Sequence, residues 1–401
     1  MDRQGRVRTP LRVNGSHSVL TVLSSPVMHA GGMRSGNPKE RSLKQLSRIA
    51  ASAVVVLARG GAGIGAIHLR RWPARGARGA GVRRRLIVGL LVVLCATLAV
   101  AGTAGIVRYV GTFWLYRGFA PPSTAPSVAV SGPGGTRHVR VVPASVESFS
   151  LASPALGGFR DLVYVVLPPG YAQHPRQRYP VLYLLHGFPG NPTNFLAIGN
   201  AAGSEAALIA AGRMKPVILV MPSGTRSYFA DQEWANAVRP GNGWETFVAH
   251  DLVHAVDARY RTISAGAGRG IAGLSEGGYA ALNIGVNHPG EFAMLESWSG
   301  YMMADQKPAI FGYGPRLLLY NSPAHQVIPA AARLRAAGTY IWFYCGASEK
   351  LAAQNQNFNA TLTALGIAHH FFERPGSHTW RLWRDLMPQA LITASRHLSH
   401  G

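Results

Sequence analysis

The chain has 401 residues and a formal net charge of +23, with 40 Lys and Arg against 17 Asp and Glu. The charge is concentrated at one end, since residues 1–86 carry 17 basic and only two acidic residues. These arginines are scattered among Gly and Ala without interleaved aromatic residues, which makes a poor surface for binding bases and excludes nucleic acid as the expected partner.

The first 85 residues are predicted to form a basic, disordered cytoplasmic tail. They contain few acidic or aromatic residues and are rich in Gly, Arg and Ser, a composition that cannot bury a core. The alternative is that residues 1–85 are not translated.

The 22 residues from Leu86 to Val107, LIVGLLVVLCATLAVAGTAGIV, carry no charge. As a helix rising about 1.5 Å per residue, they would cross the roughly 30 Å hydrocarbon core of a bilayer. Arg83 to Arg85 precede this run, so the positive-inside rule predicts a transmembrane signal anchor with a cytoplasmic N-terminus and an exported domain after Arg108. The alternative is a cleaved signal peptide and a secreted protein, because Ala99-Val100-Ala101 resembles a cleavage site.

Residues 108–140 are predicted to be a linker, because Pro, Gly and Ser dominate GFAPPSTAPSVAVSGPGGT at 118–136. Residues 141–401 are numerous enough to build a large core. Cys345 is the only cysteine of this region, so no internal disulfide is expected.

Strand-sized apolar runs recur in this C-terminal domain, at Val163–Leu167, Val181–Leu185, Val217–Met221, Ile271–Leu274, Phe292–Trp298 and Tyr340–Tyr344. Helical stretches lie between them, at Ala201–Ala211, Trp244–Tyr260, Glu276–Asn287 and Gln354–Leu365. Runs that are apolar throughout are typical of strands buried on both faces. The alternation predicts an α/β fold, a mostly parallel sheet with helices on both faces and active groups at the C-terminal ends of the strands.

One serine lies in a G-x-S-x-G pattern, Gly273-Leu274-Ser275-Glu276-Gly277, between a predicted strand and a predicted helix. In such a nucleophile elbow the turn is so sharp that side chains at the glycine positions would collide with backbone, and the serine hydroxyl is exposed. The alternative is a serine without a catalytic role in a Gly-rich turn. The choice depends on whether the chain offers Ser275 suitable partners.

The strand VLYLLHGFPG offers the first of these partners. Its Gly-rich end, from His186 to Gly190, can point a backbone N–H at an oxyanion, and the N–H of Glu276 would be the second donor. We interpret His186 as a residue that shapes this loop, because in α/β-hydrolases the base comes last in the chain.

The order serine, acid, histidine identifies the other partners by elimination. Six acidic residues lie between Ser275 and His378: Glu276, Glu291, Glu296, Asp305, Glu349 and Glu373. Glu349 alone follows a strand directly, in TYIWFYCGASEK. Five histidines follow it: His369, His370, His378, His397 and His400. His378 lies in a loop after the probable strand HHFFE, whereas His397 and His400 are assigned to a polar tail. Ser275, Glu349 and His378 therefore form the predicted triad, in which His378 removes the serine proton and Glu349 fixes its tautomer.

With these residues in place, the domain resembles the esterase D-type, or putative esterase, family of α/β-hydrolases, which includes feruloyl esterases, S-formylglutathione hydrolase and mycolyltransferases. The resemblance covers roughly residues 150 to 397. It depends on YPVLYLLHGFPGN, GWETFVAHDLVHAVDARYRT, IAGLSEGGYAALNIGVNHPGEF, CGASE and PGSHTW.

The resemblance implies roles for single residues. It matches Ser275 to the nucleophile, Glu349 to the acid and His378 to the base. The oxyanion donors would be the N–H groups of Phe188 and Glu276. One departure is Glu at position 349, where many relatives have Asp.

The segment SYFADQEWANAVRPGNGW resembles a region that lines the substrate pocket in this family. The resemblance therefore implies substrate-binding roles for Asp231 and Trp234. Residues 301–338 are expected to form either an apolar cap over the site or ordinary packing.

The sequence thus predicts a membrane-anchored, extracytoplasmic serine esterase that hydrolyses carboxylic esters through an acyl-enzyme. It contains no HExxH, no paired cysteine set and no GxxxxGK[ST], so neither a metal nor a cofactor is expected. The expected partners are an ester substrate, linked to lipid or cell envelope, and the membrane. An acyltransferase that moves the acyl group to an envelope sugar or lipid alcohol is the first alternative. A non-catalytic cell-surface binding protein is the second.

Overall fold

The computed structural model describes residues 88–103, 127–132, 135–227, 230–305 and 307–400. Residues 88–103 form a helix inside the predicted membrane span. The rest of that span, 86–87 and 104–107, and the predicted tail 1–85 lie outside the described ranges. Of the helices in the described part of the chain, none combines the length and the apolar character needed to span a bilayer.

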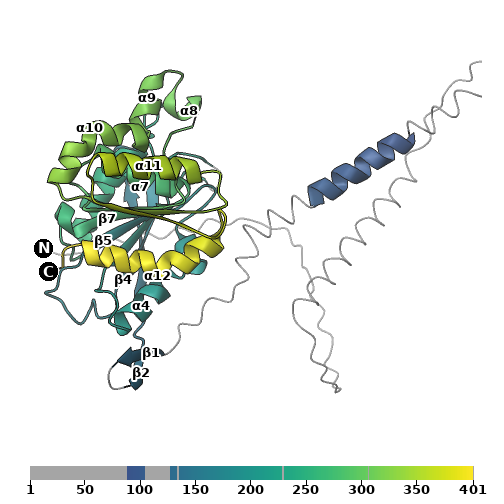
Figure 1. The fold of residues 1–401 in the computed structure, drawn as a ribbon. Coiled ribbons are helices and arrows are strands. Elements are labelled where there is room, and N and C mark those ends of the chain that lie inside the picture. Colours follow the sequence, from purple (N-terminus) through teal and green to yellow (C-terminus); the bar gives the residue numbers. More distant parts are fainter. Residues whose placement is uncertain (1–87, 104–126, 133–134, 228–229, 306, 401) are drawn as a thin grey trace, which may run out of the picture. The chain divides into compact units, whose positions relative to one another are not determined.

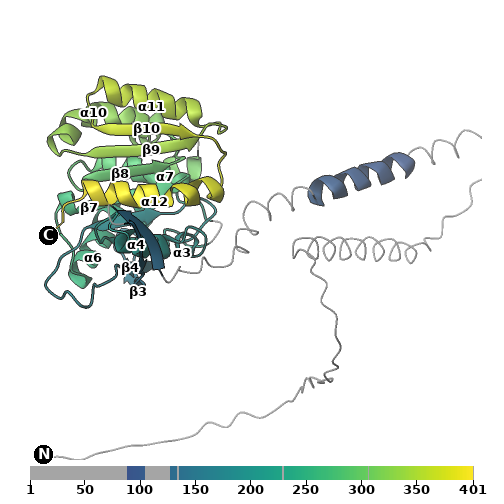
Figure 2. The same ribbon diagram turned by 60° about the horizontal axis from the view of Figure 1, so that its bottom comes forward.

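An eight-stranded sheet forms the centre of the C-terminal domain. Its strands are β3 (Ser145–Ala152), β4 (Arg160–Leu167), β5 (Val181–Leu185), β6 (Ile218–Pro222), β7 (Arg269–Leu274), β8 (Met294–Trp298), β9 (Tyr340–Gly346) and β10 (His369–Arg374). They lie in the order β10-β9-β8-β7-β5-β6-β4-β3, and Figure 2 shows β8, β9 and β10 following one another toward one edge. From β10 to β6 all neighbouring strands are parallel. The last two pairs, β6 with β4 and β4 with β3, are antiparallel.

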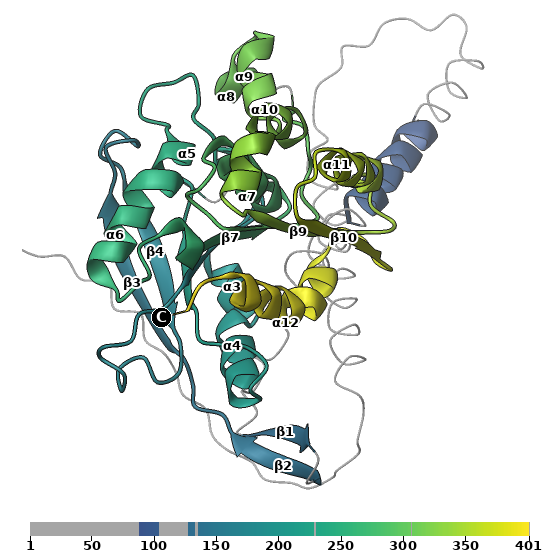
Figure 3. The same cartoon turned by 60° about the vertical axis from the view of Figure 1, so that its left-hand side comes forward.

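Helices cover both faces of this sheet. They are α3 (Thr193–Ala197), α4 (Ala201–Ala210), α5 (Trp244–Thr246), η3 (Phe247–Leu252), α6 (Val253–Arg259), η4 (Gly266–Gly268), α7 (Glu276–Asn287), α8 (Pro308–Phe311), α9 (Pro315–Tyr320), α10 (Pro323–Ala336), α11 (Ala352–Ala364) and α12 (Trp380–His397). Helices α7, α10 and α11 lie on one face, and α4 and α12 on the other (Figure 1). The view in Figure 3 separates the same two layers. The predicted α/β architecture is confirmed.

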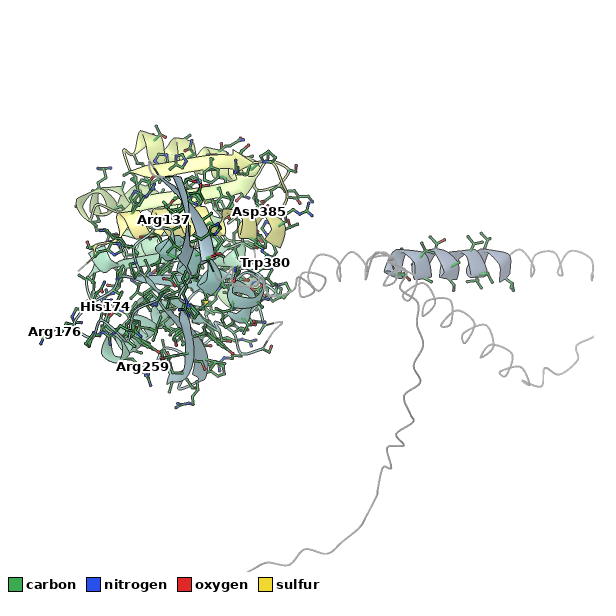
Figure 4. All side chains as sticks on the ribbon, turned by 90° about the horizontal axis from the view of Figure 1, so that it is seen from below. Arg137, His174, Arg176, Arg259, Trp380 and Asp385 are labelled. Atoms are coloured by element: carbon green, nitrogen blue, oxygen red, sulfur yellow. The ribbon has the colours of Figure 1, made fainter. Side chains whose placement is uncertain are left out.

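Strand β5 explains why the apolar runs were continuous. Val181, Tyr183 and Leu185 belong to the core packed under α7 and α10. Leu182 and Leu184 belong to the separate core under α12 and α4. Because successive side chains of a strand point to opposite faces, a strand buried on both faces has few polar positions, and β5 has no charged residue. Arg176 and Arg259 lie at the periphery (Figure 4), whereas Glu296 in β8 is fully buried.

Two predictions from the sequence were wrong in detail. Part of the predicted linker is structured, because β1 (Ser127–Gly132) and β2 (Gly135–Arg140) pair as an antiparallel hairpin. The side chains of β2 are almost all exposed, so this hairpin has no apolar run that would identify it. His397 does not belong to a polar tail, since it is the last residue of α12 and stacks on Tyr340.

Candidate active site

The loops after four neighbouring strands meet at the C-terminal edge of the sheet. Ser275 follows β7, Ser299 follows β8, Glu349 lies three residues after β9, and His378 lies four residues after β10. These strands are adjacent and parallel. Segments far apart in sequence therefore deliver their side chains to one place.

Ser275 occupies a strained turn between β7 and α7. Its φ of 56° and ψ of −122° are unusual for a residue other than glycine. The Ser275 N–H donates to the Trp298 carbonyl oxygen at 2.8 Å, which ties the turn to β8. A Cβ atom on Gly277 would overlap the Leu185 carbonyl group, and one on Gly273 would lie 2.6 Å from the same oxygen. Contact with β5 thus requires glycine at position 277, and contact with both the Gly277 carbonyl group and β5 requires it at position 273.

His378 connects the serine to the carboxylate. Its Nε2 lies 2.8 Å from Ser275 Oγ, and its Nδ1 lies 2.8 Å from Glu349 Oε2. The Glu349 side chain is 1% exposed and that of His378 is 40% exposed. The tautomer that fits both contacts has hydrogen on Nδ1, which donates to the carboxylate, and leaves Nε2 to accept the serine proton. The structure brings the three predicted triad residues together.

Glu349 has partners that the sequence analysis missed. Its Oε1 accepts hydrogen bonds from the Ser299 hydroxyl and from the Gly346 N–H, both at 2.7 Å. The indole Nε1–H of Trp383 donates to Ser299 Oγ at 3.1 Å. Ser299 directly follows the predicted strand Phe292–Trp298, and a position after a strand is the signal that identified Glu349. A serine at such a position was considered only as a nucleophile.

The predicted oxyanion donors lie beside the serine. A Cβ atom on Gly187 would come within 2.8 Å of Ser275 Cβ, so the loop after β5 is in contact with the elbow. Phe188, next in this loop, lines the pocket at Ser275. In the part of the chain that the structure describes, the N–H groups of Phe188 and Glu276 have no hydrogen-bond acceptor. Both donors are therefore free for a ligand.

A pocket opens at Ser275 and His378. Its walls are mainly apolar and aromatic, with Phe188 on one side and Trp380 and Trp383 of α12 on another. Figure 4 labels Trp380, where α12 begins. Of the described residues 301–305 and 307–338, none lines this pocket. That segment packs instead, with Phe311 and Leu318 in a small core of their own, which favours packing over a cap for this excursion.

Asp231 and Trp234 do not line this pocket. Lys307 Nζ lies 2.7 Å from Asp231 Oδ2 and also contacts the carboxylate of Glu233. Burial, reinforced by Glu233 and Asp231, raises the pKa of the Glu276 carboxyl well above its usual range. Trp234 is 1% exposed, and its indole N–H donates to the His186 carbonyl oxygen at 3.1 Å. The binding roles of Asp231 and Trp234 stay predictions.

His186 shapes the loop after β5, as interpreted from the sequence. Its Nδ1 lies 2.9 Å from the Gly187 carbonyl oxygen and its Nε2 lies 2.6 Å from that of Ser223. Burial lowers its pKa, which favours the neutral ring. A neutral ring donates to only one of these two carbonyl oxygens, but each ring nitrogen faces one of them, so neither nitrogen is directed at Ser275.

Asp161 in β4 supports the Ser223–Gly224 turn that His186 contacts. Its carboxyl group accepts the N–H of Ser223 at 2.9 Å and that of Gly224 at 3.1 Å. Burial nevertheless raises its pKa from 3.8 to about 7. Because the folded pKa lies above the unfolded one, the stability linked to the protonated form is complete below about pH 4 and is lost as the pH rises through 7.

The replacement Asp161→Asn should remove this pH dependence, because the amide keeps the shape of the protonated acid but cannot ionise. We expect the melting temperature of the variant, relative to the wild type, to rise steadily between pH 5 and about pH 8. Thermal unfolding at a series of pH values measures this difference. A difference that stays constant with pH would contradict the raised pKa.

These features define a class of protein. A strained serine between a parallel strand and a helix, followed by an acid and a histidine after later strands, is typical of serine hydrolases with the α/β-hydrolase fold. The family model described as "Putative esterase" matches residues 153–394, more than half of the chain. The chain therefore belongs to this esterase family of serine carboxylic ester hydrolases, and the predicted family resemblance is confirmed.

Individual relatives agree with this assignment. An esterase of Mycobacterium tuberculosis (Esterase Rv1288) is 29% identical over 253 residues, covering 56% of this chain and 54% of the relative. The "Diacylglycerol acyltransferase/mycolyltransferase Ag85A" of Mycobacterium ulcerans is 27% identical, covering 42% of this chain and 60% of the relative. A solved ferulic acid esterase is 26% identical with a TM-score of 0.56, over 64% of this chain and 98% of that one. The chain spans about half the length of the first of these curated relatives.

Proposed function

We propose that the chain is a membrane-anchored, extracytoplasmic serine esterase that hydrolyses carboxylic esters through Ser275, His378 and Glu349. The observation that carries the proposal is the pair of 2.8 Å contacts that His378 makes with the other two residues. Within the described residues, no cluster of His, Cys, Asp or Glu could hold a metal ion. The independence from cofactors stays a prediction.

The geometry supports a two-step acyl transfer. Ser275 Oγ attacks the ester carbonyl carbon while its proton passes to His378 Nε2, and the buried Glu349 carboxylate stabilises the resulting imidazolium. The N–H groups of Phe188 and Glu276 stabilise the oxyanion. The alcohol leaves with the proton from Nε2, and the acyl group stays on Ser275. Water then repeats the sequence, releasing the acid and restoring the serine.

Labelling and turnover together test this proposal on the full-length chain in detergent. A fluorophosphonate probe should label Ser275 covalently, and a library of carboxylic esters should identify the preferred acyl group. The outcome that contradicts an esterase is the absence of both labelling and turnover with folded protein, which is what a non-catalytic surface protein would give.

An acyltransferase is the second candidate, because relatives named as mycolyltransferases match this chain. In that case an envelope sugar or lipid alcohol replaces water in the second step. Incubation with an acyl donor and a series of alcohols distinguishes the two by the ratio of transferred to hydrolysed acyl groups. Transfer that dominates at low alcohol concentration would favour the acyltransferase.

We also propose that Leu86 to Val107 anchor the domain, with residues 1–85 in the cytoplasm. The support is the uncharged run behind Arg83 to Arg85. Moving these arginines through the membrane would cost roughly 2.5 to 3.5 kcal/mol each on translocon scales. The neighbouring membrane suggests lipid-linked or envelope-linked esters as substrates.

The topology gives a direct prediction for cell fractionation. The expressed protein should sediment with membranes, resist extraction by salt or carbonate and dissolve in detergent. Protease added to spheroplasts should cut on the C-terminal side of Arg108, while residues 1–85 stay protected. A soluble mature protein that begins near Gly102 would establish signal cleavage instead and leave the esterase proposal intact.

A further inference from the structure

Ser299 occupies the loop between the nucleophile and the acid. It follows β8, which lies between β7, the strand before Ser275, and β9, the strand before Glu349. Its side chain is fully buried, and its φ of 57° lies in the left-handed region. A left-handed conformation of a residue other than glycine persists only where the surroundings impose it, and such residues cluster at functional sites.

The direction of the hydrogen bonds at Ser299 is fixed by chemistry. An indole N–H can only donate, so Trp383 donates to Ser299 Oγ at 3.1 Å. The Ser299 hydroxyl hydrogen is then free to point at Glu349 Oε1, 2.7 Å away. With the Gly346 N–H on the same oxygen, Oε1 is held by two donors. Oε2 is thereby turned toward His378.

Trp383 touches the base as well. Its ring stands edge-on to the His378 imidazole, with centroids 4.9 Å apart and planes at 87°. It also belongs to the first turns of α12. Its backbone N–H donates to the carbonyl oxygen of Thr379, the residue that follows His378. One side chain therefore packs against His378 directly and reaches Glu349 through Ser299.

We propose that Ser299 and Trp383 are positioning residues for the esterase reaction. They form two successive hydrogen bonds, from Trp383 Nε1–H to Ser299 Oγ and from Ser299 Oγ–H to Glu349 Oε1, which orient the carboxylate toward His378. This inference rests on the function proposed above. Neither residue reacts with the substrate in this role. Without these hydrogen bonds, the Glu349 carboxylate loses one donor, and His378 loses a fixed acceptor for Nδ1–H.

Two replacements at Ser299 distinguish the effect of the lost hydroxyl from the effect of the strained backbone conformation. Ser299→Ala removes the hydroxyl and keeps the strained conformation, whereas Ser299→Gly removes the hydroxyl and tolerates a positive φ. Both should lower kcat by about 10- to 100-fold with KM nearly unchanged, because Ser299 does not line the pocket. Rates are expressed per active site, counted by fluorophosphonate titration, so that misfolded protein does not enter the result.

Ser297→Ala is the matched control. Ser297 is a fully buried serine two residues earlier on β8, and its hydroxyl has no hydrogen-bond partner within the described residues. Its replacement should leave kcat within about twofold of the wild type. A loss as large as that of Ser299→Ala would indicate that any buried serine here acts through packing, and the proposal would fail.

A double-mutant cycle tests the link to Trp383. Trp383→Phe keeps an aromatic ring beside His378 and removes the N–H donor, so kcat should fall several-fold. If Trp383 acts through Ser299, the variant Ser299→Ala/Trp383→Phe should have the kcat of Ser299→Ala alone, rather than the product of the two losses. If the kcat losses of the two single variants multiply in the double variant, Trp383 does not act through Ser299.

Different results would overturn the esterase function and the positioning role of Ser299. A wild-type protein that binds no fluorophosphonate and hydrolyses no ester overturns the proposed function itself. A wild-type protein that is active, with Ser299→Ala and Ser299→Gly retaining its kcat per titrated site, overturns only the positioning role.

Discussion

Replacing Ser275 by alanine should lower ester turnover on the order of 10⁴-fold or more. The variant lacks the oxygen that forms the acyl-enzyme, while the oxyanion donors and the pocket remain. Its unfolding temperature should change little, because alanine meets the same φ of 56° as serine. The measurement is kcat/KM with an activated ester, together with labelling by a fluorophosphonate probe.

Ser264→Ala provides the control for this experiment, since Ser264 is an exposed loop residue before the N-terminal end of β7, whereas Ser275 follows the C-terminal end of that strand. It should keep wild-type turnover and labelling. Turnover retained by Ser275→Ala would contradict the acyl-enzyme mechanism. Lost labelling with retained hydrolysis would point to a different nucleophile for the ester.

The sheet was predictable because its central strands are buried on both faces. Continuous apolar runs such as Val181–Leu185 and Ile271–Leu274 coincide with β5 and with the end of β7. The edge strand β3 was not identified, because SVESFSLA contains no continuous apolar run and its first four residues are all exposed. Its position is set by pairing with β4, and backbone pairing leaves little trace in the sequence.

The proximity of the three candidate catalytic residues was predictable for a different reason. A fixed chain order and the rule that active groups follow strands together leave few candidates, and the geometry brings Ser275, His378 and Glu349 into contact. Contacts that depend on the packing of a helix were not predictable in this way. The hydrogen bond from Trp383 to Ser299 spans 84 residues, and no local pattern relates the two.

The charged cluster beside the elbow illustrates the same limit. Lys307 lies 76 positions from Asp231 and 74 from Glu233, yet it pairs with both. For Asp231, the family resemblance of its segment predicts substrate binding instead. An ion pair between two irregular segments depends on how both segments fold against Glu276 and its neighbours, so it could not be inferred from either segment.

Gly277→Ala should have the largest effect on stability. The added Cβ would overlap the carbonyl group of Leu185, and β5 cannot move aside because β6 and β7 pair with it on either side. Relief would require α7 to shift away from the sheet. We expect a loss of about 3 kcal/mol or more in the free energy of unfolding, at the upper end of overpacking effects.

Gly314→Ala is the matched control for this change, because a Cβ atom on Gly314 meets no atom within 4 Å and its φ of −90° suits alanine. It should change the free energy of unfolding by less than about 1 kcal/mol, because Gly314 is the N-cap of α9, where alanine is less favourable than glycine. Denaturant unfolding of both variants measures the two values. Gly277→Ala with wild-type stability would mean that the elbow can relax, and the glycines of the motif would then need another explanation than contact with β5.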